Sequence, residues 1–295
     1  MTSSKVRYLI FFQYFGTKYS GVMKTPTHQN ILGVQNYLEE AVLKLRPANE
    51  VSVSVSSRTD SGVHALCNSA HVDIQRKSGK PPFTERLLVD ALNDHLKPEP
   101  ISILKAYRVA DDIHARYRAL SRTYVYRIIT GARHYSQLPV FERSLCWAVH
   151  ENHLNVTALQ EAAKLLLGTH DFSTFRSLNS ETPFKSPIKT LLQAEVCSGA
   201  GSFSQHLFHR AVVVVDECAD IDSVLCVAQV RRMTGALVAV GQGRLSPSEV
   251  KDLLEVRDSL AYPQNMMAPP DGLFLQKVEY EETDLFPEAM ETDLT

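Results

Sequence analysis

The sequence predicts an α+β protein of two halves, forming one continuous, mostly antiparallel sheet flanked by helices. Runs of β-branched and aromatic residues with a period of two alternate with amphipathic runs of helical period, which favours this class. In the first half these runs follow the order β-α-β-β-α-β, the ferredoxin-like arrangement, and the second half is similar in kind. No linker rich in Gly or Pro separates the halves, so we expect one continuous unit.

The first half, residues 1–110, contains two predicted helices among four predicted strands. In the run 33–46, Val34, Leu38 and Val42 recur on one face, as in an amphipathic helix. The run VSVSVSS alternates strictly and predicts a half-buried strand, and Thr84 is a suitable N-cap for the second helix. The expected strands are 7–15, 51–57, 68–75 and 101–109, and the expected helices are 33–46 and 84–96.

The second half, residues 111–280, mixes strands and helices in a different order. Ser246, Pro247 and Glu249 together predict a capping box with proline at the first helical position. The acidic tail 281–295 is expected to be disordered. The expected strands are 121–130, 190–197, 207–215 and 272–280, and the expected helices are 153–168, 224–241 and 246–256.

Composition excludes several classes of function. The 295 residues carry a formal charge of −2 and no apolar run long enough for a membrane span. The five cysteines are scattered without a CxxC pair, which argues against a zinc site or a disulfide framework. No dinucleotide-binding, P-loop or serine-hydrolase motif occurs. We therefore expect no cofactor and no metal.

The stretch SSRTDSGVHA at 56–65 admits two interpretations. The first is a β-connection in which Asp60 and Gly62 only turn the chain, and composition and spacing alone favour it. The second is an active site. Arg58 lies two residues from Asp60 and would favour its ionised form, and Gly62 permits a tight backbone that exposes the carboxylate.

Several ordered motifs resemble the TruA family of tRNA pseudouridine synthases. RTDSGVHA is similar to the family signature RTDAGVHA, and YFGTKYSGV at 14–22 to its opening Y-D-G-x-x-Y-x-G-W-Q. ADDIHARYRALSRTYVYRI, LLGTHDFSTFRS, QVRRMTGALVAVGQG and APPDGLFL resemble four further family segments. The resemblance covers almost the whole chain and is greatest to the animal pseudouridine synthase-like 1 branch.

The resemblance implies a cofactor-free isomerase that converts uridine to pseudouridine in tRNA, with the anticodon arm as target and a central RNA-binding cleft. Asp60 would be the nucleophile. Arg58 would take the space of the displaced uridine or hold its phosphate, Tyr124 would stack on the uracil, and Arg231 would pair with Asp60. The candidates for RNA phosphate contacts are Arg116, Arg118, Arg122 and His64.

The family further implies a homodimer that clasps tRNA, without a membrane or metal partner. Its branch suggests the mitochondrial matrix, with the cytoplasm as alternative, since the N-terminus shows no clear presequence. The chain departs from the family pattern at Phe15, at Val22-Met23, and in 216–226, where carboxylates interrupt the approach to Arg231. That last departure supports a rival hypothesis, a catalytically weak or inactive RNA-binding protein. A nucleosidase or glycosidase is a weaker alternative, because no second acid is recognisably paired with Asp60.

Overall fold

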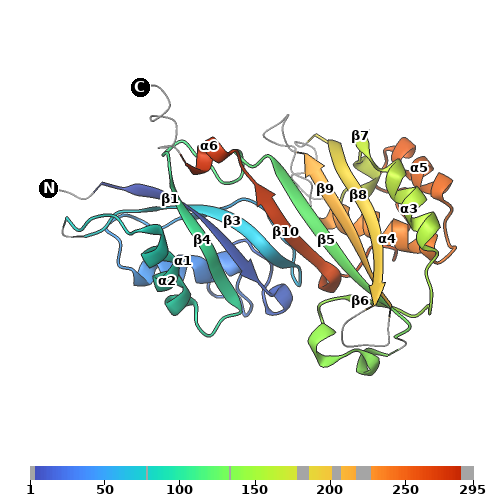
Figure 1. The fold of residues 1–295 in the computed structure, drawn as a ribbon, viewed down its shortest axis with the longest axis horizontal. Helices are drawn as coiled ribbons and strands as arrows, with labels where there is room; N and C mark the ends of the chain where they lie inside the picture. The colour runs from blue at the N-terminus through green and yellow to red at the C-terminus, as the bar shows by residue number, and fades with distance from the viewer. Residues whose placement is uncertain are drawn as a thin grey trace. The chain divides into compact units, whose positions relative to one another are not determined.

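The computed structural model describes residues 4–77, 79–132, 134–177, 186–200, 207–216 and 227–286. The chain forms two compact units, which are described separately (Figure 1). The first unit comprises Met1–Leu120 and Leu275–Thr295, and the second comprises Ser121–Phe274. The second unit is therefore an insertion in the chain of the first.

The first unit contains a sheet in the order β4-β1-β3-β10, with β2 paired to β3. Strands β1, β2, β3 and β4 pair antiparallel. Helix α1 contacts α2 and β2, and α2 contacts β4. The elements are β1 (Val6–Tyr14), α1 (Val34–Lys44), β2 (Val53–Val55), β3 (His64–Ile74), α2 (Glu85–Leu96), β4 (Ile101–Val109), β10 (Leu273–Glu279) and α6 (Glu282–Leu285).

Local chemistry explains where these elements begin. The hydroxyl of Thr84 accepts the Leu87 amide and caps α2, as predicted. The alternating side chains of β1 place Tyr8, Ile10 and Phe12 on one face, where all three are fully buried. The Tyr8 hydroxyl donates to a backbone carbonyl just before α2 at 2.8 Å, so its polar end is satisfied.

The second unit has a sheet in the order β5-β9-β8-β7, with the short β6 running parallel to β5. Helix α3 contacts α4, α5 and β8. All residues of α4 are buried except Arg231 and Arg232, which are partly buried. The elements are β5 (Ser121–Thr130), β6 (Trp147–Val149), α3 (Val156–Leu165), β7 (Gly168–Asp171), β8 (Ile188–Ala200), β9 (Leu207–Asp216), α4 (Val227–Gly241) and α5 (Pro247–Val256).

The predicted class, a mixture of helices with mostly antiparallel strands, is confirmed. The capping box of α5 is present, with the Ser246 amide donating to Glu249 at 2.7 Å. The sequence divided the chain at 110/111 and gave the last strand to the second half. In the structure, residues 111–120 and most of β10 group with the first unit, where β10 neighbours β3 and the Tyr280 hydroxyl donates to the Ala115 carbonyl at 2.6 Å.

Part of the acidic C-terminal segment forms a short helix. Residues Glu282–Leu285 of the predicted disordered tail form α6, and Phe286 contacts Tyr107 edge-on. Residues 217–226, which hold most of the carboxylate-rich departure, lie outside the described residues, as does the tail beyond 286. None of the helices within the described ranges is long and apolar enough to cross a membrane.

Candidate active site

Asp60 lies in a tight loop between β2 and β3, residues 56–63, which we call the Asp60 loop. The loop is fixed by backbone contacts: Asp60 forms an antiparallel bridge with Gly21, and the Val22 amide donates to the Thr59 carbonyl at 3.1 Å. The Val63 amide donates to the Asp60 carbonyl at 3.2 Å across Gly62, whose φ is +80°. A glycine suits this conformation because it lacks a β-carbon.

The segment 14–22 packs against the Asp60 loop and supports it. The hydroxyls of Tyr14 and Thr59 form a 2.8 Å hydrogen bond. The Ser61 hydroxyl donates to the Tyr19 carbonyl at 3.1 Å. These contacts join two motifs that lie about forty residues apart in the sequence. The backbone of the Asp60 loop is thereby held in place through both its side chains and its peptide groups.

Two glycines of that segment are required by close approach. A β-carbon on Gly16 would lie 1.9 Å from the Val63 carbonyl oxygen. Gly21 has a φ of +116°, and its β-carbon would lie 2.5 Å from the Thr59 carbonyl oxygen. Neither position accepts another residue without movement of the Asp60 loop. In the sequence, the spacing Y-x-G…G of segment 14–22 marks this contact between the glycines and the Asp60 loop. Its structural role was not predicted.

The side chains of this loop differ in exposure. Arg58 is exposed and Asp60 is partly exposed, whereas Thr59 is buried. His64 is fully buried, and its Nδ1 accepts the Gly16 amide at 3.0 Å. This contact gives His64 a supporting role in the fold, and its burial argues against the predicted contact with an RNA phosphate. The neutral imidazole must carry its proton on Nε2 to accept at Nδ1.

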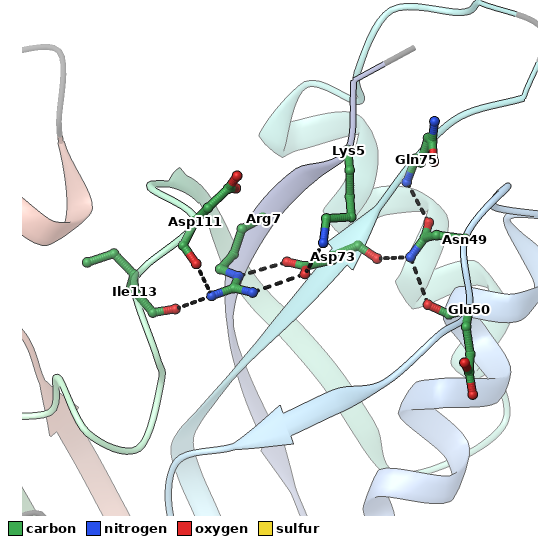
Figure 2. Close-up of polar contacts among 8 residues, drawn as sticks. All are labelled: Lys5, Arg7, Asn49, Glu50, Asp73, Gln75, Asp111 and Ile113. Carbon is green, nitrogen blue, oxygen red and sulfur yellow. Dashed lines mark hydrogen bonds and ion pairs between the residues drawn. The ribbon is translucent and has the colours of Figure 1, made fainter. Parts of the chain in front are cut away.

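Arg116 lies in the segment 110–118, which is anchored to the sheet of the first unit by Arg7 (Figure 2). Arg7 of β1 makes a bidentate ion pair with Asp73 of β3, with distances of 2.7 and 3.0 Å. The same guanidinium donates to the carbonyls of Asp111 and Ile113. The hydrogen bond from Arg7 holds the pKa of Asp73 below its usual value.

Two further side chains fix this segment. The Ala115 amide donates to Nδ1 of His71 at 3.1 Å, and the Ala115 carbonyl accepts from the Tyr280 hydroxyl. Burial, together with the nearby His114 and Arg7, lowers the pKa of His71 to about 4. His71 is therefore neutral at physiological pH, as an acceptor at Nδ1 must be. Both peptide groups of Ala115 are satisfied by buried side chains.

Three candidates belong to the second unit. Arg122 and Tyr124 lie two residues apart on the same face of β5, and both are buried. Burial of Arg122 favours an internal contact over one with an RNA phosphate. Arg231 on α4 donates from Nε to the Ala268 carbonyl at 2.9 Å, while the Ala268 amide donates to the Arg231 carbonyl at 3.1 Å. The arginine is thus anchored to the segment APPDGLFL.

Close packing positions α4 against the same segment. A β-carbon on Gly235 would lie 1.9 Å from the Met266 carbonyl oxygen, so this helix turn requires glycine. Tyr126 donates to the Pro269 carbonyl at 2.6 Å, and burial raises its pKa above the ordinary value although Arg231 opposes the rise. Tyr126 therefore stays protonated and serves as a hydrogen-bond donor. The described residues contain no cluster of three potential metal ligands.

Comparison with known proteins identifies relatives along nearly the whole chain. A family model described as tRNA pseudouridine synthase matches residues 10–118 and 162–281. A Xenopus laevis protein named tRNA pseudouridine synthase-like 1 is 60% identical over 285 residues, covering 97% of this chain and 95% of its own length. The Homo sapiens protein of that name is 46% identical, with coverages of 94% and 91%. A tRNA pseudouridine synthase A from Hyphomonas neptunium is 36% identical, with coverages of 93% and 98%.

Proposed function

Because this chain belongs to the tRNA pseudouridine synthase family, a class of isomerases, we propose that it converts uridine to pseudouridine in tRNA with Asp60 as the nucleophile. The observation that carries the role of Asp60 is its place in the structure. It is a partly exposed carboxylate on a loop that Gly21, Val22 and Tyr14 hold rigid. A nucleophile must be held in a fixed position. A rigid backbone holds it there without a further loss of conformational entropy at the reaction step.

The reaction breaks the bond between N1 of uracil and C1′ of ribose and forms a bond between C5 and C1′. The C5 proton is lost and N1 gains a proton, so the isomerisation needs no redox partner. A carboxylate can form the covalent intermediate by attack on the ribose or on the pyrimidine ring. Asp60 takes this role in the proposal.

Other side chains are assigned roles around the reacting uridine. A uridine in folded RNA must leave its stack before reaction, at a cost of a few kcal/mol. The exposed Arg58 would fill the vacated space or hold the phosphate. Tyr124, which is 1% exposed in this structure, would stack on the uracil once its ring is uncovered, and Arg231 would pair with Asp60. Arg116 would contact an RNA phosphate. We further propose that each unit has a ferredoxin-like arrangement of strands and helices.

The target site in tRNA, the oligomeric state and the compartment of the protein are inferred as well. We infer that the target lies in the anticodon arm, that the protein acts as a homodimer, and that it works in the mitochondrial matrix. These inferences rest on the resemblance to the pseudouridine synthase-like 1 branch. Site-resolved mapping of pseudouridine in cytoplasmic and mitochondrial tRNA, with and without the protein, tests the target and the compartment together.

Replacement of Asp60 by Asn tests the nucleophile. We expect Asp60→Asn to lower the rate of pseudouridine formation by more than about 10³-fold, because the amide is isosteric but not nucleophilic. Its affinity for tRNA should stay within a few-fold of wild type. Asp94→Asn is a matched control, since it removes an equal charge from an exposed helix residue paired with Lys97. Pseudouridine formation by Asp60→Asn at the wild-type rate contradicts the assignment. A wild-type protein that binds tRNA but modifies none supports the rival, an inactive RNA-binding protein.

A further inference from the structure

Tyr117 is an exposed aromatic side chain on a segment whose backbone is fixed. It retains 51% of its surface exposed. One face of its ring stacks on His114, with ring centroids 4.3 Å apart and an angle of 25° between the planes. His114 in turn contacts the buried His71 edge-on at 4.6 Å. The Tyr117 ring is thus supported on one face by a column of imidazoles that reaches the sheet.

The segment that carries Tyr117 is also held by Arg7, whose contacts are drawn in Figure 2. Arg7 holds the carbonyls of Asp111 and Ile113, and His71 accepts the amide of Ala115. Two backbone amides, those of Tyr117 and Arg118, donate to the His114 carbonyl at 3.1 and 3.0 Å and close the turn. An exposed ring on such a rigid turn loses little conformational entropy when it binds a ligand.

The charges beside the ring favour an anionic partner with a flat aromatic group. The Arg116 guanidinium carbon lies 5.7 Å from the centre of the Tyr117 ring. The carboxylate of Asp112 is paired with Arg118 at 2.7 Å, so its negative charge is balanced there and does not cancel the positive charge of Arg116. An aromatic platform with an adjacent guanidinium is suited to an unpaired base and its phosphate.

We propose that the Tyr117 ring stacks on an unpaired nucleobase of the RNA substrate, while Arg116 contacts the adjoining phosphate. The inference rests on the proposed function, because it names a contact to the same RNA. It adds a binding position outside the Asp60 loop. In this arrangement His114 and Arg7 are positioning residues, which act through the ring and the turn rather than by touching the RNA.

Binding measurements on the full chain test the inference. We expect Tyr117→Leu to weaken binding of an unmodified tRNA preparation by about 5- to 100-fold, the range typical for loss of one base–aromatic stack. Tyr117→Phe and Tyr117→Trp keep a ring and should bind within about threefold of wild type. Binding of a fully paired RNA duplex should not change with any of these variants, because its bases are not available for stacking.

Phe286→Leu is the matched control, since Phe286 is also 51% exposed in the same unit. Tyr117→Gln, a second variant without a ring, guards against a failure of Tyr117→Leu to fold. Wild-type tRNA affinity in both variants overturns the inference, and so does an equal loss of tRNA and duplex binding. A changed oligomeric state at constant tRNA affinity assigns Tyr117 to a protein contact instead, and also overturns it. Pseudouridine formation by the wild type is scored separately, so the proposed function can fail while the stacking contact stands.

Discussion

His71 makes the stability of the first unit sensitive to acid. Its imidazole is only 8% exposed, and its Nδ1 must be unprotonated to accept the Ala115 amide. The lowering of its pKa from 6.5 to about 4 comes first from burial and then from His114 and Arg7, while Asp73 opposes it. A histidine whose pKa is lowered in the folded state contributes stability above its unfolded pKa. That contribution is lost as pH falls from about 6.5 towards about 4.

The size of this loss follows from the two pKa values. At about 1.4 kcal/mol for each pH unit, the full difference between 6.5 and about 4 amounts to about 3 kcal/mol. Between about pH 7 and about pH 4.5 the free energy of unfolding should fall by about 2 kcal/mol through His71 alone. Carboxylates and other histidines titrate in the same range, so the effect must be measured as a difference between two proteins.

His71→Asn supplies that difference. The Asn Oδ1 can accept the Ala115 amide in place of Nδ1 but does not titrate. Urea unfolding followed by circular dichroism at the two pH values gives the free energy of unfolding of each protein. Loss of packing in the variant is common to both pH values and cancels. We expect the variant to lose about 2 kcal/mol less than wild type between them. Equal losses in the two proteins would refute the argument.

Two other predictions concern glycine and cysteine. Gly21→Ala should cost about 1 to 3 kcal/mol of stability and reduce the rate of pseudouridine formation, because its β-carbon would strike a carbonyl of the Asp60 loop. Gly243→Ala is the control, because Gly243 has a φ of +73° but open space where a β-carbon would lie, so that only backbone conformation is affected. If both variants have the same thermal stability and activity, the close approach of Gly21 to the Asp60 loop is not the cause of the loss. Burial raises the pKa of Cys146 to about 11, whereas Cys197 is exposed. A thiol reagent at about pH 8 should therefore label Cys197 before Cys146, as followed by peptide mass mapping; equally fast labelling of Cys146 in the folded protein would count against its burial.

Much of the fold could be predicted because strong periodicity marks the long elements. The strands 101–109 and 121–130 have the predicted bounds, and Ser246 and Glu249 cap α5 as their spacing indicates. The short strands β6 and β7, of three and four residues, were not predicted. So few residues show no period, and such strands exist only through pairing with a neighbour.

The candidate site was harder to predict than the fold, because residue type does not reveal whether a side chain is buried. His64 and Arg122 carry groups suited to RNA phosphates, yet both are fully buried. The sequence also gave no indication that Arg7 and His71 hold the segment with Arg116, since those contacts join strands to a segment about a hundred and about forty residues away. Hydrogen bonds of this kind depend on tertiary packing and leave no local signal.

The insertion of the second unit has a consequence for synthesis. A ribosome releases β1 to β4 early, but β10 and Tyr280 emerge only after the whole of the inserted unit. Until then Ser69 lacks its 2.6 Å hydrogen bond with the Tyr280 hydroxyl, and the Ala115 carbonyl lacks its buried donor. The nascent first unit therefore lacks these contacts while residues 121–274 are translated. The segment that carries Tyr117 would acquire this support only after the second unit has been synthesised.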